Sequence, residues 1–285
     1  MSGRDIDLEL PHLRLAGREW GLDDGEPVLA LHGWLDNSAS FDRLAPLLPE
    51  LHLVALDLAG HGRSQHRAPG VFHHFVDWVP EIAAAADALG WPEFSLIGHS
   101  MGAGISSLMP ATFPERVKRV VLLEGAGPLA ATADKAAAQL SSALADEGKI
   151  RASGSRVFPD LDAAIGARAR DTELDRESAR LLVERGSEVA GGGIRFTYDP
   201  RLKTRSRFRF TENQVLAFLA AISCPVLAIR ALQGWPFPED IVMARLAVIP
   251  DLERAEVEGG HHVHLTHPER VTPPIKKFFS ETRRG

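Results

Sequence analysis

A serine between two glycines joins a short apolar run to a segment of helical spacing, and no other feature constrains the fold as strongly. Residues 94–97 form the apolar run, helical spacing continues over residues 102–113, and the junction reads Gly98-His99-Ser100-Met101-Gly102. A strand that passes directly into a helix needs a sharp, strained turn, and flanking glycines remove the side chains that would clash there. We expect the Ser100 hydroxyl to project over the carboxyl edge of a parallel sheet, with a helix N-terminus behind it.

Apolar runs alternate with helical segments on both sides of this turn, which indicates an α/β fold with a mostly parallel, doubly wound sheet. Strands are expected at residues 27–32, 51–58, 94–97, 118–123, 225–231 and 254–257, and an opening strand at 12–20 is expected to form a hairpin with the segment after it. Helices are expected at residues 41–48, 76–89, 102–113, 239–246 and 268–279. Residues 129–221 show only helical stretches, broken by three glycines at 191–193. The predicted organisation is a core of residues 1–128 and 222–285, interrupted by a helical cap at 129–221.

Composition narrows the class of protein. The net charge of -6 leaves no basic surface for a nucleic acid. The N-terminus lacks the apolar segment of a secretory signal, and the longest apolar stretch, residues 215–222, is too short to cross a membrane. The single cysteine, Cys224, excludes an internal disulfide, fits a reducing compartment and resembles a small buried hydrophobe more than a catalytic thiol. We expect a cytoplasmic protein, a monomer or homodimer, with no membrane insertion.

A nucleophile at Ser100 that attacks an acyl group needs donors for the oxyanion that forms. One donor is expected from the backbone N–H of Met101, at the start of the helix. The loop after the strand at 27–32 is expected to supply the second, and we assign it to the backbone N–H of Trp34. The Trp34 indole either packs beside the site or forms a wall of the substrate pocket.

Three motifs together resemble the α/β-hydrolase superfamily. They are Leu31-His32-Gly33-Trp34-Leu35-Asp36-Asn37, Asp57-Leu58-Ala59-Gly60-His61-Gly62-Arg63-Ser64, and the turn around Ser100. The stretch from Gly33 to Ser38 is similar to the serine-hydrolase-like proteins within that superfamily, which are cap-bearing members of carboxylesterase type. The resemblance covers both ends of the chain and weakens across residues 129–221, which correspond to the family's cap. It implies a helical cap inserted after the strand that follows the nucleophile helix.

Four of the twelve histidines crowd together, at positions 261, 262, 264 and 267. The base follows the last strand in this fold, because the triad runs in the order serine, acid, histidine. Residues 259–269 resemble the family's Gly-His…Pro-Glu segment, in which the base follows the glycine, so the register selects His261 and leaves His262 as the alternative. His264 and His267 are expected to be polar residues at a helix entrance.

No metal or cofactor is expected. A metal site in the histidine cluster would need a partner carboxylate, and none lies at a motif spacing from His261 or His264. His32 and His99 lie inside motifs, and we assign them with Trp34 to the substrate pocket, either lining it or holding it as structural hydrogen-bond partners.

The acid of the triad has more than one candidate. Most relatives place an aspartate after the strand at 225–231, where this chain has Gln233 and Gly234 and no carboxylate before Glu239. Some relatives, including certain haloalkane dehalogenases, place the acid at the end of the strand after the nucleophile helix. Glu124 stands there, directly after four apolar residues, where a charge needs a partner. Glu124 is the favoured acid; the alternatives are Asp240, or no working acid and a Glu124 that caps the loop at 125–127.

The resulting prediction is a serine hydrolase that cleaves a small to medium carboxylic ester through an acyl-enzyme on Ser100. A cofactor-free haloperoxidase, a C–C bond hydrolase and a slow-turnover ligand-binding protein are the alternatives on the same fold. Dehalogenases and epoxide hydrolases have an aspartate at the position of Ser100, which argues against both. In the basic stretch at 195–210, the arginines either pair with acidic residues or face solvent, or else Arg201 or Arg205 binds an anionic substrate group.

Overall fold

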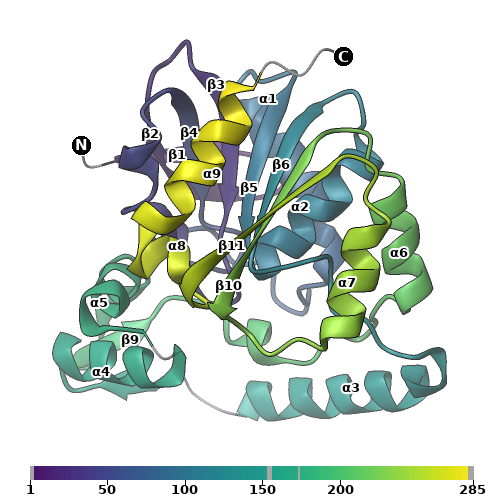
Figure 1. Cartoon of the computed structure of the whole chain (residues 1–285). Coiled ribbons are helices and arrows are strands. Elements are labelled where there is room, and N and C mark those ends of the chain that lie inside the picture. The colour runs from purple at the N-terminus through teal and green to yellow at the C-terminus, as the bar shows by residue number, and fades with distance from the viewer. Residues whose placement is uncertain (1–2, 153–155, 173, 282–285) are drawn as a thin grey trace.

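A computed structural model describes residues 3–152, 156–172 and 174–281, and its centre is an eight-stranded sheet (Figure 1). The strand order is β1-β2-β4-β3-β5-β6-β10-β11, and every neighbouring pair from β4 to β11 is parallel. The strands are β1 (Arg4–Glu9), β2 (Arg14–Trp20), β3 (Glu26–Leu31), β4 (Leu51–Leu56), β5 (Phe94–His99), β6 (Val117–Leu123), β10 (Val226–Gln233) and β11 (Leu252–Gly260). This is the α/β-hydrolase fold that the sequence predicts.

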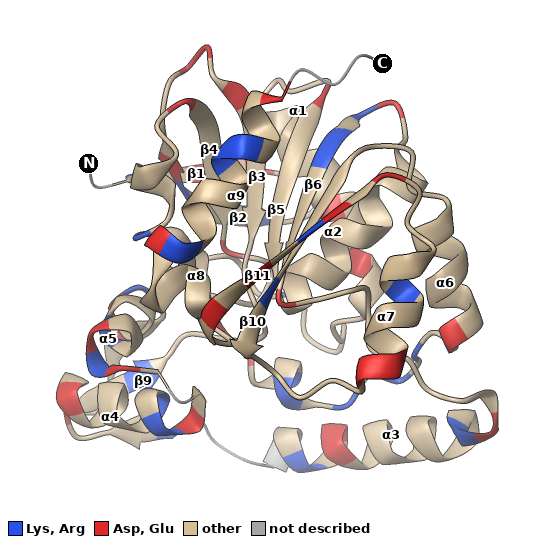
Figure 2. Ribbon diagram, in the orientation of Figure 1, with Lys and Arg blue, Asp and Glu red and all other residues tan. Residues whose placement is uncertain are grey.

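Helices cover both faces of the sheet because its central strands are apolar on both sides. β5 is buried along its whole length and contains no Lys, Arg, Asp or Glu. Charged residues of both signs are instead interspersed over the outer helices and loops (Figure 2). One apolar layer packs α1 (Trp78–Ala88), α2 (Met101–Thr112), α6 (Glu212–Ala220) and α7 (Glu239–Ala247) on one face. The other layer packs α9 (Pro268–Ser280) and the short α8 (Val263–Thr266) with the 3-10 turns η1 (Ser38–Phe41) and η2 (Ala45–Leu47).

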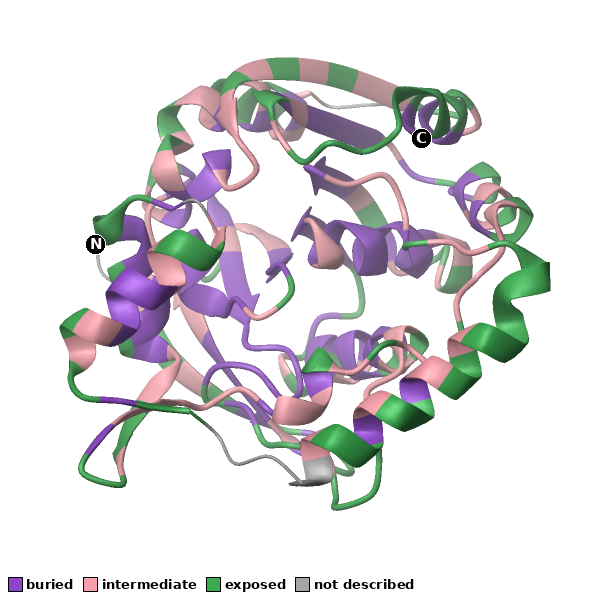
Figure 3. Cartoon of the chain, turned by 90° about the horizontal axis from the view of Figure 1, so that it is seen from below, coloured by how far each residue is buried: buried purple, intermediate pink, exposed green. Residues whose placement is uncertain are grey.

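Much of the segment between β6 and β10 lies beyond the carboxyl edge of the sheet (Figure 1). It contains α3 (Ala136–Ala152), α4 (Leu161–Thr172) and α5 (Arg176–Arg185), with η4 (Ala133–Lys135) and η5 (Pro200–Lys203). Viewed from that side, α3 is exposed along much of its length (Figure 3). Helix α6, which the sequence places in the cap, packs its Val215 and Leu219 into the core layer, so the part that stands off the sheet ends before Glu212.

The expectation of a purely helical insertion is wrong. A three-stranded antiparallel sheet, β7-β9-β8, lies within it, formed by β7 (Val157–Phe158), β8 (Ser187–Ala190) and β9 (Gly193–Phe196). Gly191 and Gly192 both have positive φ, as a tight two-residue hairpin turn requires. The glycines at 191–193 therefore mark a hairpin and not a break between helices.

Two further expectations are corrected near the N-terminus. The opening strand pairs with β1, which precedes it, through the register Arg4↔Glu19 to Glu9↔Arg14, so the hairpin lies on its N-terminal side and not on its C-terminal side. The structure has the 3-10 turns η1 and η2 in place of the helix expected at residues 41–48. A third 3-10 turn, η3 (Phe75–Asp77), precedes α1. Pro46 disfavours a continuous helix at 41–48, because it lacks an N–H and its ring crowds the carbonyl four residues back, and it lies instead in the first turn of η2.

Among the residues that the structure describes, none of the helices combines the length and the apolar character needed to cross a bilayer.

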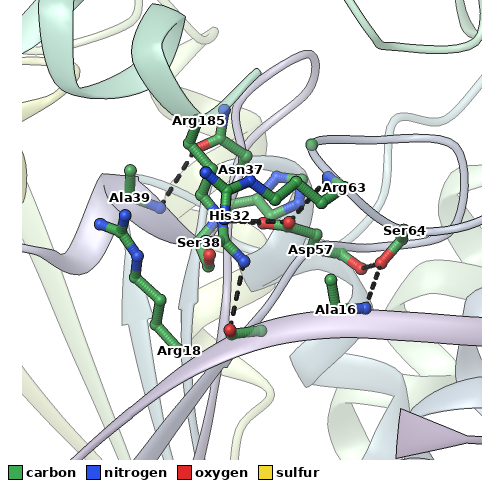
Figure 4. A network of polar contacts seen from close by, with 12 residues as sticks. Ala16, Arg18, His32, Asn37, Ser38, Ala39, Asp57, Arg63, Ser64 and Arg185 are labelled. Atoms are coloured by element: carbon green, nitrogen blue, oxygen red, sulfur yellow. Dashed lines mark hydrogen bonds and ion pairs between the residues drawn. The ribbon is translucent and has the colours of Figure 1, made fainter. Parts of the chain in front are cut away.

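A buried ion pair fastens the insertion to the core (Figure 4). Arg185, at the end of α5, donates from Nε to both carboxylate oxygens of Asp57 at 3.0 Å, and both side chains are buried. Asp57 follows β4 and also accepts the backbone N–H groups of Ser38 and Arg63 at 2.7 and 2.9 Å. Beside this pair, Asn37 donates to the carbonyl of Leu182 in α5 at 2.9 Å. The α5 end of the insertion is therefore fixed next to the loop that follows β3.

Arg185→Ala should lower the free energy of unfolding by about 3–5 kcal/mol, because it leaves the Asp57 charge buried without its cation. Arg180→Ala on the same helix is the matched control: Arg180 and its partner Glu184 are about half exposed, so its loss should change stability by less than about 1 kcal/mol. Urea denaturation followed by tryptophan fluorescence measures both. Equal effects of the two substitutions would show that the buried pair does not anchor the insertion.

Candidate active site

The sequence elements that carry the predicted triad end at one edge of the sheet. Ser100 follows β5, Glu124 follows β6 and His261 follows β11, and β5, β6, β10 and β11 are consecutive parallel strands. Carboxyl ends of parallel strands meet at the same edge, where open α/β sheets bind their ligands. The topology therefore brings together three residues that are far apart in the chain.

Ser100 occupies the strained turn that the sequence predicts. Its φ is 52° and its ψ is -110°, a conformation that non-glycine residues rarely adopt. A Cβ at Gly98 would lie 2.4 Å from the carbonyl oxygen of Gly102, and one at Gly102 would lie 2.0 Å from that of Leu31. Both glycines are therefore required for β5 to turn directly into α2 at this point.

His261 bridges the other two residues. Its Nε2 lies 3.0 Å from the Ser100 Oγ and its Nδ1 lies 3.1 Å from the Glu124 Oε2. Since a carboxylate only accepts hydrogen bonds, Nδ1 carries the proton and Nε2 presents a lone pair to the serine hydroxyl. The ring is mostly buried, with 17% of its side-chain surface exposed.

The carboxylate of Glu124 has three donors around it. The backbone N–H groups of Ala231 and Trp235 donate to it at 2.6 and 3.1 Å, and His261 donates at 3.1 Å. Its φ of 54° is positive, so a second strained residue belongs to this cluster. These donors belong to β10 and the segments after β10 and β11, so the carboxylate does not cap the loop at 125–127. Asp240, the alternative acid, lies exposed in the first turn of α7.

Glycine at position 234 makes room for this acid. A Cβ at Gly234 would lie 2.1 Å from the Glu124 Oε2, so the carboxylate fills the space in which a side chain at 234 would begin. Position 234 belongs to the loop where most relatives are expected to carry the acid. The structure thus places a carboxylate from β6 where that loop would otherwise supply one.

The two backbone N–H groups assigned to the oxyanion hole belong to segments next to Ser100: one follows it in the chain, and the other follows the neighbouring strand. Met101 is the first residue of α2, so its N–H is among the amides that have no acceptor within the helix. Trp34 follows β3, which pairs with β5. The Trp34 indole is about half exposed and donates its N–H to the carbonyl of Leu202 at 3.0 Å, so it links the site to the insertion.

Of the two roles considered for His32 and His99, the structure favours that of structural hydrogen-bond partners over that of pocket-lining residues. Neither has exposed surface. His32 accepts the backbone N–H of Leu58 at Nε2 and donates from Nδ1 to the carbonyl of Gly33, and burial lowers its pKa. His99 Nε2 bonds to the carbonyl of His261 at 2.8 Å. Both act as internal supports for the loops around the site.

A second polar cluster lies beside the triad, and no sequence pattern identified it. The Asp36 cluster consists of Asp36, His99, His262 and His264. His262, the alternative base, points its Nε2 at Asp36 Oδ2 at 3.3 Å and not at Ser100. His264 is fully buried, contacts the Ser40 hydroxyl at 2.8 Å and has its pKa lowered by burial to about 3. Asp36 lies in a motif that the sequence analysis identified, and this was the available signal. Its contact with His262 was not predicted because the two residues are far apart in the chain.

The other titratable groups singled out in the sequence have structural surroundings. Arg201 forms an ion pair with the Asp199 carboxylate and donates to the carbonyls of residues 67, 68 and 71. Arg205 pairs with Asp146. Burial raises the pKa of the Cys224 thiol to about 12, which suits an inert packing residue. Exposed His267 contacts its neighbour Thr266 at the entrance to α9.

Comparison with known proteins identifies the family and agrees with the fold. A family model described as the alpha/beta hydrolase fold matches residues 26–268. A serine hydrolase-like protein of Danio rerio is 33% identical, and the match covers 98% of this chain and 89% of that protein. Serine hydrolase-like protein 2 of Homo sapiens is 32% identical, and the match covers 98% of this chain and 94% of that protein. A crystal structure of a hypothetical protein from Pseudomonas aeruginosa PAO1 is 41% identical, covers 97% of this chain and 99% of that one, and superimposes with a TM-score of 0.93. The chain therefore belongs to the α/β-hydrolase family.

Proposed function

We propose that the protein is a serine hydrolase that cleaves small to medium carboxylic esters, with Ser100 as nucleophile, His261 as general base and Glu124 as acid. One observation carries the proposal: His261 contacts the serine hydroxyl with one ring nitrogen and the carboxylate with the other. This is the arrangement that activates a hydroxyl which is otherwise a poor nucleophile. The relatives named serine hydrolase-like proteins support the same class of activity.

The reaction follows from the positions of the protons. His261 Nε2 takes the Ser100 proton as Oγ attacks the ester carbonyl carbon, and Glu124 stabilises the imidazolium that forms. Backbone N–H groups of Met101 and Trp34 stabilise the negative oxygen of the tetrahedral intermediate. The intermediate expels the alcohol, which takes its proton from His261. Water then attacks the acyl-enzyme with His261 again as base, releasing the carboxylic acid and restoring Ser100.

Exposed aromatic side chains beside the triad favour an apolar substrate. The Trp235 ring lies 5.6 Å from the His261 ring between centroids, and its side chain is 60% exposed although its backbone N–H is fixed to Glu124. Trp34, on the other side of β5 in the strand order, is also about half exposed. Because Arg201 is paired with Asp199 and Arg205 with Asp146, a neutral acyl group suits the site better than an anionic one.

Ser100→Ala should abolish hydrolysis of p-nitrophenyl butyrate and labelling by a fluorophosphonate probe. Glu124→Gln should lower kcat by about 10⁴-fold, because the neutral amide no longer fixes the tautomer and charge of His261. Asp240→Asn is the matched control and should retain the parent's kcat. Full activity in Glu124→Gln together with loss in Asp240→Asn would reassign the acid, and labelling of Ser100→Ala would reassign the nucleophile.

The acid should also be movable to position 234. Glu124→Ala should lose activity, and adding Gly234→Asp should restore at least about tenfold of it, because the new carboxylate enters the space that Glu124 vacates. The control pair is Glu124→Ala with Gly234→Asn, which has nearly the same shape without the charge and should give no recovery. Steady-state kinetics compare the variants. Equal activity in the aspartate and asparagine pairs would contradict the role of the carboxylate.

A further inference from the structure

The Asp36 cluster contains two buried polar atoms that face each other without a hydrogen between them. His99 Nε2 must carry a proton, because it bonds to the carbonyl oxygen of His261 and a carbonyl only accepts. His99 is fully buried, and a neutral imidazole carries only one proton, so its Nδ1 presents a lone pair. This Nδ1 has no hydrogen-bond partner among the described residues and lies 3.9 Å from Asp36 Oδ2.

Only one oxygen of the Asp36 carboxylate is fully satisfied. The carboxylate is buried and lies against the Arg168 guanidinium, which favours its charged form. Its Oδ1 is paired with the guanidinium of Arg168, from α4. Its Oδ2 has no well-formed hydrogen bond within the described part of the chain, although His262 Nε2 lies 3.3 Å away. An unsatisfied carboxylate oxygen and an imidazole lone pair are costly in a dry interior.

A bound cation would satisfy both the carboxylate oxygen and the imidazole lone pair. Together with a nitrogen of His262, these atoms form a group close enough to hold one. Asp36 Oδ2, His99 Nδ1 and His262 Nε2 all lie within 4.8 Å of one another. Zinc binds imidazole nitrogen and carboxylate oxygen at about 2.0–2.2 Å, which puts neighbouring ligand atoms of a tetrahedral site about 3.4 Å apart. The distances from Asp36 Oδ2 to His262 Nε2 and His99 Nδ1, 3.3 and 3.9 Å, are near that spacing, and binding would require the two imidazole nitrogens, which lie within 4.8 Å, to take up the same spacing.

We propose that Asp36, His99 and His262 bind a divalent transition-metal ion of the zinc class, beside the triad and separate from it. Two imidazoles and one carboxylate select such ions over magnesium and calcium, which prefer sets of oxygen ligands. His261 is not a ligand, because its ring nitrogens are committed to Ser100 and Glu124.

The surroundings of these ligands are those of a supported metal site. Metal-binding histidines typically donate their other ring N–H to a carbonyl or carboxylate, and His99 donates to the carbonyl of His261. Ligating carboxylates are themselves hydrogen-bonded, and Arg168 holds the second oxygen of Asp36. A small cavity whose lining includes Asp36 and Arg168 lies on the insertion side of the carboxylate. A bound ion would brace the residues next to the base and next to the nucleophile.

Zinc binding should be measured on the full chain carrying Ser100→Ala, which removes the proposed catalysis and leaves the Asp36 cluster intact. After removal of metal with a chelator, titration against a chromophoric zinc chelator should give one bound Zn²⁺ per chain and a higher melting temperature. Co²⁺ should give visible absorption bands of low-symmetry nitrogen and oxygen coordination. Because this readout does not depend on turnover, it stands or falls separately from ester hydrolysis.

His262→Gln should weaken zinc binding by at least about 100-fold, beyond the usual effect of losing an outer-shell partner. Asp36→Asn is the second variant, since its amide oxygen still accepts from Arg168, and it should weaken binding similarly. Exposed His267→Gln is the matched control and should bind zinc as the parent does. Absence of stoichiometric binding, or equal binding in His262→Gln, Asp36→Asn and the control, would overturn the proposal and leave a buried water as the occupant.

Discussion

The architecture of the site depends on the hydrogen bonds that the Glu124 carboxylate accepts. It accepts hydrogen bonds from the backbone of β10, from the loop after β10 and from the histidine after β11. One side chain directly after β6 therefore contacts three neighbouring segments at the edge of the sheet. Without it, the N–H of Ala231 would be a buried donor with no acceptor, and His261 would have no partner to fix its orientation.

This arrangement requires strained backbone conformations at two residues and glycines at the positions where a side chain would clash. Ser100 and Glu124 both have positive φ, and a strained residue persists only where its surroundings determine its conformation. Gly98 and Gly102 allow the serine turn, and Gly234 leaves the space that the acid occupies. The buried pair of Arg185 and Asp57 then holds α5 beside the loop after β3. Residues outside the triad thus decide whether the triad can form.

The buried parallel strands and the turn at Ser100 were predictable, because a continuous apolar run followed by a glycine-flanked serine admits few structures. Glu124 could also be inferred, since a charge directly after four apolar strand residues needs a partner. Strand β1 was missed because most of its residues are charged, and the strands of the β7-β9-β8 sheet were missed because each has only two to four residues. Tertiary pairing therefore decides their conformation. The contact of Asp36 with His99 and His262 joins residues distant in the chain, and no local pattern reports it.

The proton between His261 Nδ1 and Glu124 tests the central claim most directly. Proton NMR in water should show a resonance far downfield of the amide region in the parent protein, from an imidazole proton that this hydrogen bond protects from exchange. The resonance should disappear in Glu124→Gln while other downfield signals, such as that of the buried His32, remain. A downfield spectrum that is identical in the parent and in Glu124→Gln would show that Glu124 does not hold the base.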